Sequence, residues 1–458
     1  MGERLTGADA AWLHMDRPTN RMIVNMVAWF DQEPDWDELR TLLQERWVDN
    51  YPRFRQVVDE PRIPLGRIAM PEWVEVDDFH LDDHIVTAKL PAPGDDAALH
   101  AYVEQQVAEP LPKNQPLWQL HFLSGYREGG AMLLRASHAL GDGTALMHGL
   151  LALADETPER DQLGPAALVD PPSDEDTGTR GLGSVWRFVS GYLSTLGEFG
   201  RGQLARGRDF LTEAVTNLKL IPALQDRRTI LRRPLGTEKR VTWTTTVPVD
   251  AVRAAAKDAG ATVNDVLLAA IAAATGRYLR EHGDDTSEIG MMLPFNLRSL
   301  DRPMPRTLGN KFGLVFPVVP VRRMDRTARV AAVHEVMQHI KSSDQARVVF
   351  AWVSSLGTMV TEIEQIAIDR YAGMSSLIVT NVPGPKARVR IAGTEVTGLL
   401  FWVPTSGPVG VGLSLISYAG DLIVGIVVDA KLMPDVERFR ELLDEELAAV
   451  VRTEHVPA

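Results

Sequence analysis

The spacing of hydrophobic and polar residues changes along the chain, and it predicts a succession of strands and helices. Residues 20–31 are apolar and β-favouring, which predicts a strand. Residues 34–48 repeat Trp and Leu at helical spacing, which predicts an amphipathic helix with one apolar face. A second helix is expected over residues 95–108. This mixture is typical of an α/β or α+β protein.

Two apolar runs in the middle of the first half predict a β-hairpin. The runs cover residues 117–126 and 131–137, and a turn is expected between them at 128–130. The second run ends at His138. After a glycine-rich break, an apolar helix is expected over residues 145–154.

The second half repeats the mixture of strands and helices. We expect strands at 239–249, 291–296, 312–321, 375–381, 396–403, 411–418 and 421–428, and helices at 250–259, 263–281, 326–344 and 434–452. Both halves therefore predict an α/β fold class, in the form of an α+β sandwich.

A polar stretch at 156–180, rich in Pro and Asp, is the clearest linker in the sequence. An amphipathic region at 184–224 and a basic run at 227–240 follow it. The predicted domains are an N-terminal domain (1–170), a crossover segment (171–238) and a C-terminal domain (239–458).

Composition narrows the class of protein. The 458 residues carry a net charge of −13, which disfavours a nucleic-acid binder. Cysteine is absent, which excludes disulfides and thiolate nucleophiles and fits a reducing compartment. No run approaches the roughly 18–20 apolar residues of a membrane span, and no signal-peptide pattern opens the chain. We expect a cytoplasmic protein whose membrane contact, if any, is peripheral.

His138 differs from the other histidines in its setting. A predicted strand delivers it, and Gly141, Asp142 and Gly143 follow it, so its side chain should be held at the rim of a sheet, where pockets form. The alternative is a tight turn in which Asp142 caps the next helix. The remaining histidines are expected to be solvated or packed, and no metal site is expected; the residues considered are His80, His84, His148, His334 and His339.

The spacing from His138 to Asp142 and Gly143 resembles the active-site motif of the coenzyme A-dependent acyltransferase superfamily. Further elements in the same order are similar to one branch of it, the bacterial wax ester synthase/diacylglycerol acyltransferases, over nearly the whole chain. These elements are residues 5–30, 79–84, 115–118, 264–265, 293–298, 309–313 and 380–385. One position departs from the family, which often has two histidines in a row, because Ser137 stands where the first would be.

The resemblance implies two chloramphenicol-acetyltransferase-like domains with an active-site tunnel between them. It implies transfer of a long-chain acyl group from acyl-CoA to a lipid hydroxyl, either of diacylglycerol or of a fatty alcohol. His138 would be the general base, since neutral imidazole has a pKa of about 6.5, and no covalent intermediate is needed. Acyl-CoA would be a substrate and no cofactor is expected. Acyl-CoA and a lipid alcohol are the expected partners, with peripheral contact at a membrane or lipid-droplet surface.

Roles for other residues follow from the same resemblance. Asp142 is expected to shape the loop and to pair with an arginine, for which Arg298 is the candidate. Asn264 is the candidate oxyanion donor, and the alternative is that it caps a helix over residues 265–281. Loop-shaping glycines are expected at Gly141 and Gly143, and pocket-lining residues at Pro116, Leu117, Trp118, Asn310 and Asn381.

Two other functions stay open at this point. One is a related acyltransferase that takes its acyl group from a carrier protein or uses another alcohol. The other is a catalytically silent lipid-binding homologue; the intact His138, Asp142 and Gly143 argue against it, while Ser137 keeps it open.

Overall fold

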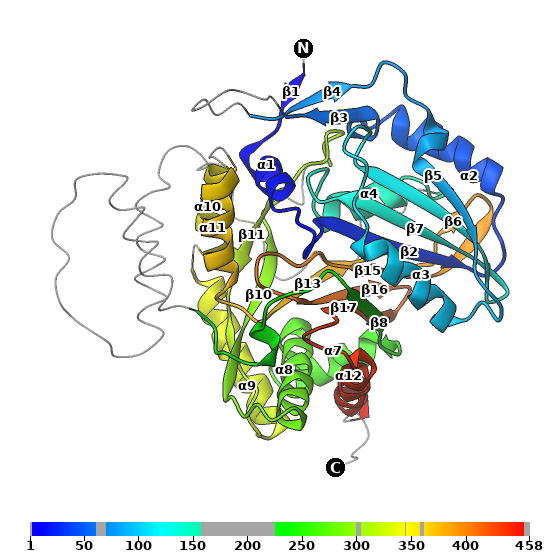
Figure 1. The fold of residues 1–458 in the computed structure, drawn as a ribbon. Helices are drawn as coiled ribbons and strands as arrows, with labels where there is room; N and C mark the ends of the chain where they lie inside the picture. Colours follow the sequence, from blue (N-terminus) through cyan, green and yellow to red (C-terminus); the bar gives the residue numbers. More distant parts are fainter. Residues whose placement is uncertain are drawn as a thin grey trace, which may run out of the picture.

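Two β-sheets with flanking helices make up the protein, as the computed structural model shows (Figure 1). The structure describes residues 2–60, 70–156, 225–298, 304–343, 345–357 and 361–452. Nearly all of the expected linker and the whole amphipathic region at 184–224 lie outside these residues. The α/β fold class predicted from the sequence is confirmed.

The first sheet has six strands in the order β14-β15-β2-β7-β6-β5. Its neighbours are antiparallel except β5 and β6, which run parallel. The strands are β2 (Ile23–Phe30), β5 (Ile85–Lys89), β6 (Trp118–Tyr126), β7 (Gly129–Ser137), β14 (Arg390–Ile391) and β15 (Thr394–Trp402). β7 lies between β2 and β6 and is buried along its whole length, so the residue after it is held by a rigid strand.

The second sheet has eight strands, with the main order β11-β10-β13-β16-β17-β8. β13 runs parallel to β10 and β16, and the other neighbours are antiparallel. The strands are β8 (Lys239–Trp243), β9 (Val247–Pro248), β10 (Glu288–Asn296), β11 (Phe312–Val315), β12 (Val318–Pro320), β13 (Leu377–Pro383), β16 (Val411–Tyr418) and β17 (Asp421–Asp429). A small third sheet joins β1 (Glu3–Arg4), β4 (Glu72–Glu75) and β3 (Gln56–Asp59).

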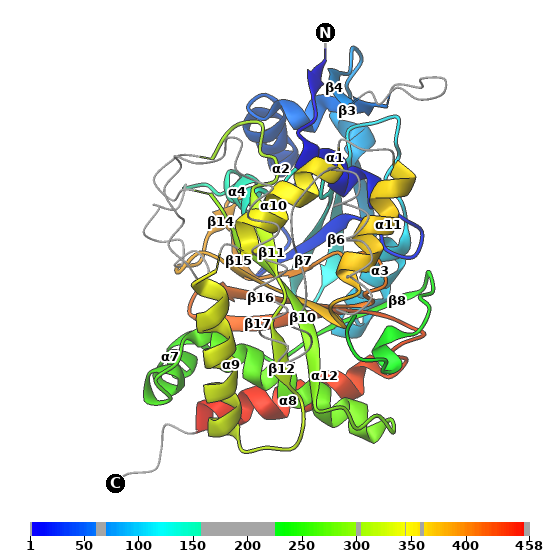
Figure 2. The same ribbon diagram turned by 90° about the vertical axis from the view of Figure 1, so that its left-hand side faces the viewer.

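The helices gather into groups that cover the sheets. Figure 2 shows α7, α8, α9 and α12 at one end of the molecule, packed on the second sheet, and α1 and α2 at the other end. The α-helices are α1 (Gly7–His14), α2 (Trp36–Leu43), α3 (Asp96–Ala108), α4 (Gly143–Leu151), α7 (Val249–Asp258), α8 (Val263–Glu281), α9 (Arg326–Lys341), α10 (Gln345–Leu356), α11 (Thr361–Ala372) and α12 (Val436–Val451). No single helix in the described ranges is long and apolar enough to cross a membrane, although α7 and α8 pass that test as a bent pair.

The two halves of the chain are interlocked. β14 and β15 come from the C-terminal half, yet β15 pairs with β2 and so extends the first sheet. Close to this crossing, Lys239 and Asp429 form a buried ion pair with Nζ and Oδ2 2.8 Å apart, and Lys239 also donates to Asn20. Removing one partner of a buried ion pair is costly. The pairing of β15 with β2 and the bond from Lys239 to Asn20 join the first half of the chain to the second.

One turn was misplaced, and several helices and short strands were not predicted. The expected hairpin turn is formed by Arg127, with φ of 54°, and Glu128, so the prediction of a turn at 128–130 is wrong. Gly129 instead begins β7, where a Cβ would collide with the backbone of Phe30 and Gln32. Helices α10 and α11 and the short strands β1, β3, β4 and β5 were not predicted.

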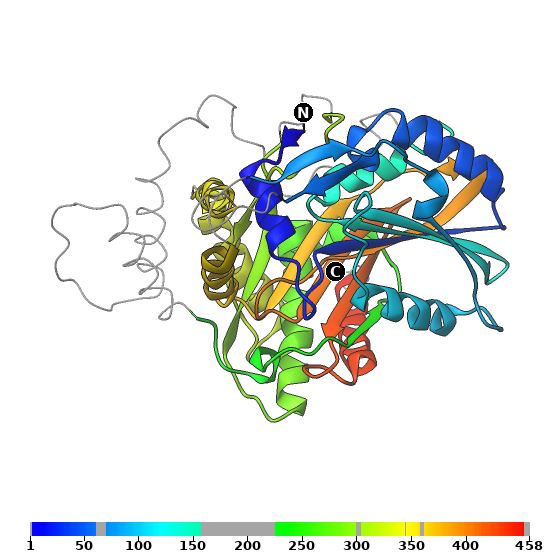
Figure 3. The same cartoon turned by 45° about the horizontal axis from the view of Figure 1, so that its top comes forward.

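Helix α1 lies beside α10 and α11 (Figure 3). Trp12 and Met15 of this region join Val349 and Tyr371 in a hydrophobic cluster of their own. The contact with α10 is close because Gly7 has no side chain, and a Cβ there would collide with the carbonyl of Ser354. Gly7 therefore sets the distance between α1 and α10.

Replacing this glycine tests the close packing. Alanine normally favours a helix over glycine by about 1 kcal/mol, yet Gly7→Ala should destabilise the fold by about 1–3 kcal/mol because α1 must shift. Gly149→Ala in α4 is the matched control, since a Cβ there would lie 3.9 Å from Phe54, an ordinary contact. Urea denaturation should give a lower midpoint for Gly7→Ala and an equal or higher one for Gly149→Ala. Equal midpoints for the two variants would contradict the packing.

Candidate active site

His138 lies directly after β7, at the junction between the two halves of the chain. Its backbone N–H donates to the carbonyl of Met22 at 2.7 Å, which continues the pairing of β7 with β2. The residue is only 7% exposed. The strand end and this hydrogen bond hold the imidazole rigidly, as the sequence predicted for a histidine at a sheet rim.

Aromatic rings enclose the imidazole of His138. Trp12 of α1 stacks on it with ring centroids 4.5 Å apart, and the ring of Phe312 lies 5.6 Å away in a tilted arrangement. Burial lowers the pKa of His138, while the charge of Asp142 and hydrogen bonds to the backbone carbonyl of His138 itself and to Asn310 oppose that shift. The ring is therefore neutral at physiological pH, the state in which an imidazole can accept a proton.

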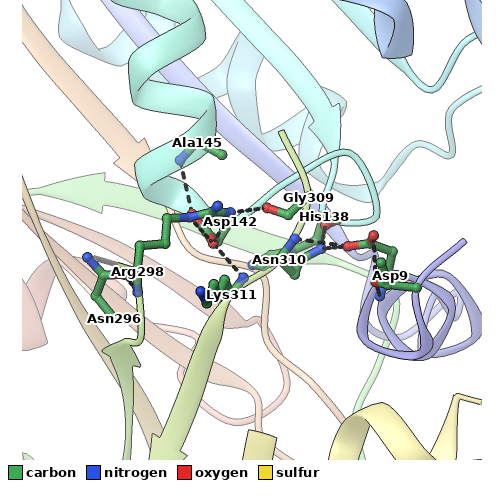
Figure 4. Close-up of polar contacts among 10 residues, drawn as sticks. Asp9, His138, Asp142, Ala145, Asn296, Arg298, Gly309, Asn310 and Lys311 are labelled. Carbon is green, nitrogen blue, oxygen red and sulfur yellow. Dashed lines mark hydrogen bonds and ion pairs between the residues drawn. The ribbon is translucent and has the colours of Figure 1, made fainter. Parts of the chain in front are cut away.

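Asn310 contacts both the side chain and the backbone of His138. Its Oδ1 lies 2.9 Å from Nδ1 of the ring, and its Nδ2 donates to the His138 carbonyl at 2.7 Å (Figure 4). The same Nδ2 donates to Oδ1 of Asp9 at 2.8 Å. Among the described residues, no hydrogen bond engages Nε2 of the ring. Asn310 was expected to line a substrate pocket, and the structure places it against the histidine.

Asp142 is the N-cap of α4 and also binds the other half of the chain. Its Oδ1 accepts from the backbone N–H of Ala145 at 3.0 Å, and its Oδ2 accepts from the backbone N–H of Lys311 at 3.0 Å (Figure 4). The guanidinium of Arg298 forms an ion pair with Oδ2 at 2.9 Å and donates to the carbonyl of Gly309. The expected pairing of Asp142 with Arg298 is therefore confirmed. Asp142 also caps the next helix, as the tight-turn alternative for the His138 loop predicted.

Glycines allow the loop after His138 to approach the second half closely. Gly141 and Gly309 form a parallel backbone bridge, and a Cβ on Gly141 would meet that of Ala145 at 2.9 Å. A Cβ on Gly143 would lie 3.2 Å from Val382, which follows Asn381 in β13. Gly309 has φ of 80°, a conformation that glycine adopts readily.

Among the described residues, no hydrogen bond or ring contact joins the His138 ring to the other expected pocket residues, Pro116, Leu117, Trp118 and Asn381. Ser137 ends β7, and its backbone N–H donates to the carbonyl of Leu117 at 2.9 Å. Trp118 is fully buried and stacks on His84 with ring centroids 4.6 Å apart. Pro116 is buried and Asn381 is half-buried in β13. Their part in a substrate pocket stays a prediction.

Asn264 lies in the first turn of α8, buried with 4% exposure. The N-cap of that helix is Thr262, which forms a capping box with Asp265, so the alternative in which Asn264 caps the helix is wrong. No hydrogen bond or ring contact in the described part of the chain joins Asn264 to His138. Its role as an oxyanion donor stays a prediction.

The remaining histidines have structural surroundings. His80 is exposed, as expected, but His84 is 2% exposed and its Nδ1 lies 2.9 Å from the carbonyl of Trp118, so the expectation of a solvated position is wrong for it. The short helical turn Leu81–His84 directs this ring inward. His334 bonds to the capping residue Asp265 at 2.7 Å. Within the described ranges, no group of three or more His, Asp or Glu side chains could hold a metal ion.

Asp9 and Trp12 belong to the site although the sequence did not single them out. Both are on α1, far from the His138 motif in sequence, and both were read only as part of the family-like segment 5–30. A signal was present, since Asp9 is a charged residue enclosed by alanines in an apolar helix and its burial demands polar partners.

Two family models match the chain. The model described as the wax ester synthase/diacylglycerol acyltransferase catalytic domain matches residues 5–267, and the model of the corresponding C-terminal domain matches residues 308–450. Among curated proteins, a Mycobacterium tuberculosis protein assigned as a diacylglycerol O-acyltransferase is 26% identical, over 97% of this chain and 90% of its own.

Solved structures with the same fold include enzymes of two kinds. The wax ester synthase/diacylglycerol acyltransferase from Marinobacter aquaeolei is similar with a TM-score of 0.68 and 20% identity, over 98% of this chain and 99% of its own. The first condensation domain of the calcium-dependent antibiotic synthetase is similar with a TM-score of 0.60 and 16% identity, over 98% of each chain. At these identities the similarity establishes the fold.

The ion pair of Asp142 and Arg298 gives a stability prediction. The side chains are 9% and 12% exposed, so Arg298→Ala would leave a buried carboxylate without its cation. We expect a loss of about 3–5 kcal/mol in the free energy of unfolding. The control is Arg253→Ala, which breaks a pair with Asp250 whose side chains are 51% and 91% exposed and should cost less than about 1 kcal/mol. Similar losses from both variants in urea denaturation would contradict this account.

Proposed function

Because the chain belongs to the wax ester synthase/diacylglycerol acyltransferase family, we propose that it transfers a long-chain acyl group from acyl-CoA to a lipid hydroxyl with His138 as general base. Membership makes it an acyl-CoA-dependent O-acyltransferase. The proposal adds the base, the acyl length and the acceptor, which is diacylglycerol, a fatty alcohol or both.

The observation that carries the proposal is the environment of the His138 ring. Nδ1 lies 2.9 Å from an amide oxygen, while Nε2 has no hydrogen bond to any described residue. Burial lowers the pKa of the ring, so it is neutral and can accept a proton. A hydroxyl is a poor nucleophile at neutral pH, so this base is what the reaction needs.

The proposed reaction needs no covalent enzyme intermediate. Nε2 of His138 takes the proton as the acceptor oxygen attacks the thioester carbonyl carbon, and a new C–O bond forms. The C–S bond then breaks, and His138 returns the proton to the departing thiolate of coenzyme A. General-base catalysis contributes roughly 10²–10⁴-fold, which is about 3–5 kcal/mol of the barrier.

In this proposal, Asp142 holds the loop of His138 in place and takes no part in proton transfer. Its oxygens already accept from Ala145 and Lys311 and pair with Arg298, so they are not available to share the proton of the base. The bonds to Lys311 and Arg298 cross the junction between the two halves. Asp142 thereby holds the loop that carries His138 against the loop that carries Asn310.

The rival donor is an acyl group on a carrier protein, as the sequence left open. The condensation-domain likeness concerns the fold alone and does not favour this donor. We also propose peripheral contact with a membrane or lipid-droplet surface, which an enzyme with a lipid acceptor needs. The amphipathic region 184–224 is the candidate for that contact and lies outside the described residues.

The test of the base is release of free coenzyme A from palmitoyl-CoA with diacylglycerol or hexadecanol as acceptor. We expect His138→Ala to lose at least about 10²-fold in kcat while keeping the folded circular dichroism spectrum. His148→Ala is the control, a half-buried histidine on α4 that contacts Tyr51 and should keep near-normal turnover. Near-normal turnover of His138→Ala would contradict the mechanism, and release only from acyl-carrier protein would favour the rival donor.

The pH dependence follows from the lowered pKa of His138. The active form is neutral, so the rate falls as the pH drops through the pKa of the ring. Because burial lowers the pKa of the ring below its usual value of about 6.5, the midpoint of the acid limb of kcat/KM should lie below pH 6.5. An acid limb centred above pH 6.5 would show that the base is not this buried ring.

A further inference from the structure

A line of hydrogen bonds runs from the start of helix α1 to His138, and its bonds from Asp9 onward are buried (Figure 4). Thr6 donates through its hydroxyl to Oδ2 of Asp9 at 2.7 Å, Asp9 accepts from Asn310 through Oδ1, and Asn310 meets the ring of His138. We infer that Asp9, acting through Asn310, helps to hold the His138 ring with its proton on Nδ1 and its lone pair on Nε2. This inference rests on the proposed role of His138 and names two positioning residues for it.

The first step concerns the orientation of the Asn310 amide. Its Nδ2 has two hydrogens, and both point at acceptors, the Asp9 carboxylate at 2.8 Å and the His138 carbonyl at 2.7 Å. Neither a carboxylate nor a carbonyl can donate. Turning the amide over would place its oxygen against both of them. The amide is therefore fixed with Oδ1 toward the ring.

The second step concerns the ring itself. A neutral imidazole has one N–H, and the hydrogen bond at one nitrogen decides the state of the other. Oδ1 of Asn310, 2.9 Å from Nδ1, and the backbone carbonyl of His138 itself can only accept, so Nδ1 must carry the proton and donate it. Nε2 then carries the lone pair. In water the neutral ring prefers the opposite arrangement, so the protein reverses the intrinsic preference of the side chain.

The third step concerns Asp9. The side chain is 4% exposed, and its Oδ1 accepts from both the backbone N–H and the Nδ2 of Asn310, at 2.9 and 2.8 Å. One carboxylate oxygen thus fixes both the path of the loop and the orientation of the amide. Burial raises the pKa of Asp9, and the hydrogen bonds from Thr6 and Asn310 oppose that shift and favour the charged acceptor.

The fourth step is the anchoring of α1, which carries Asp9. His14 at the end of this helix bonds to the buried carboxylate of Glu364 at 2.7 Å. Arg17, just beyond it, forms two bonds with the carboxylate of Asp369 at 2.7 and 2.8 Å. Both partners belong to α11, so the C-terminal half holds α1 in place and keeps Asp9 within reach of Asn310.

The experiment compares four variants in the full chain: Asn310→Ala, Asn310→Asp, Asp9→Ala and Asp9→Asn. Asn310→Ala removes the acceptor at Nδ1, and Asn310→Asp keeps it and adds charge. Asp9→Ala removes the acceptor for the amide, and Asp9→Asn can keep it through Oδ1. The measurements are kcat and KM for palmitoyl-CoA, the pH profile, and the tautomer of His138 by ¹⁵N NMR of histidine-labelled protein, assigned by its loss in His138→Ala.

We expect Asn310→Ala to lose about 10–10²-fold in kcat with KM within about 2-fold, because substrate binding does not need the tautomer. Its His138 signal should move toward the form with the proton on Nε2. Asn310→Asp should recover most of kcat and shift its acid limb to higher pH, since a carboxylate stabilises the charged ring. Asp9→Ala should change kcat and the tautomer in the same direction as Asn310→Ala but by less, and Asp9→Asn should change them by less again.

The control is Asn20→Ala, a buried asparagine that bonds to Lys239, Thr405 and two backbone carbonyls away from the ring. It should lower the Tm without moving the tautomer or the acid limb. A wild-type ring protonated on Nε2, or equal losses in Asn310→Ala and Asn310→Asp with an unmoved acid limb, would overturn the inference. The NMR result does not depend on turnover. The inferred role of Asp9 and Asn310 can therefore prove wrong while His138 remains essential for activity. Equally, His138 can prove not to be the base while its tautomer is the inferred one.

Discussion

The structure depends on one constraint, which is that polar groups buried where the two halves of the chain meet must find partners across the junction. His138 and Asp142 come from the first half, and Asn310, Lys311 and Arg298 come from the second. Each is buried or nearly so, and each is satisfied by hydrogen bonds to the other side. An unpaired buried carboxylate or amide would cost more than a surface contact contributes. The site is therefore also part of what joins the halves.

Such a junction needs a rigid frame on both sides. β7 is the buried central strand that delivers His138, and β15 of the C-terminal half adds to the same sheet through β2. The ion pair of Lys239 and Asp429 and the anchoring of α1 on α11 fix further points of the frame. A small shift of one half would lengthen several short hydrogen bonds at once. Stability and the geometry of the candidate site are thus coupled in this chain.

The sequence predicted the parts of the fold that have strong local patterns. Regular hydrophobic periods located β2, the β6–β7 hairpin, α8 and α12 to within a few residues. Helix α10 has buried residues at helical spacing and could have been predicted in the same way. The hairpin turn was misplaced because Gly129 and Gly130 serve close packing instead of the turn.

The candidate site was predictable only where its residues are close in sequence or belong to a known motif. His138, Asp142 and Arg298 followed from the motif and from charge complementarity. The contact of Asn310 with Asp9 joins residues 301 positions apart, and no local pattern encodes it. Asn264 was assigned to the chemistry by resemblance alone, and no hydrogen bond among the described residues joins it to the ring. Long-range pairing of buried polar groups is the information that only the structure supplied.

The central claim is that His138 removes the proton from the acceptor hydroxyl, and a series of acceptors with falling hydroxyl pKa tests it most directly. Long-chain alcohols carrying zero, one or two fluorines on the carbon next to the hydroxymethyl group keep a similar shape while their hydroxyl becomes more acidic. A more acidic hydroxyl depends less on a general base. The account predicts that the loss in kcat/KM caused by His138→Ala is greatest for the unfluorinated alcohol and shrinks steadily along the series. A loss of the same size for every acceptor would contradict it.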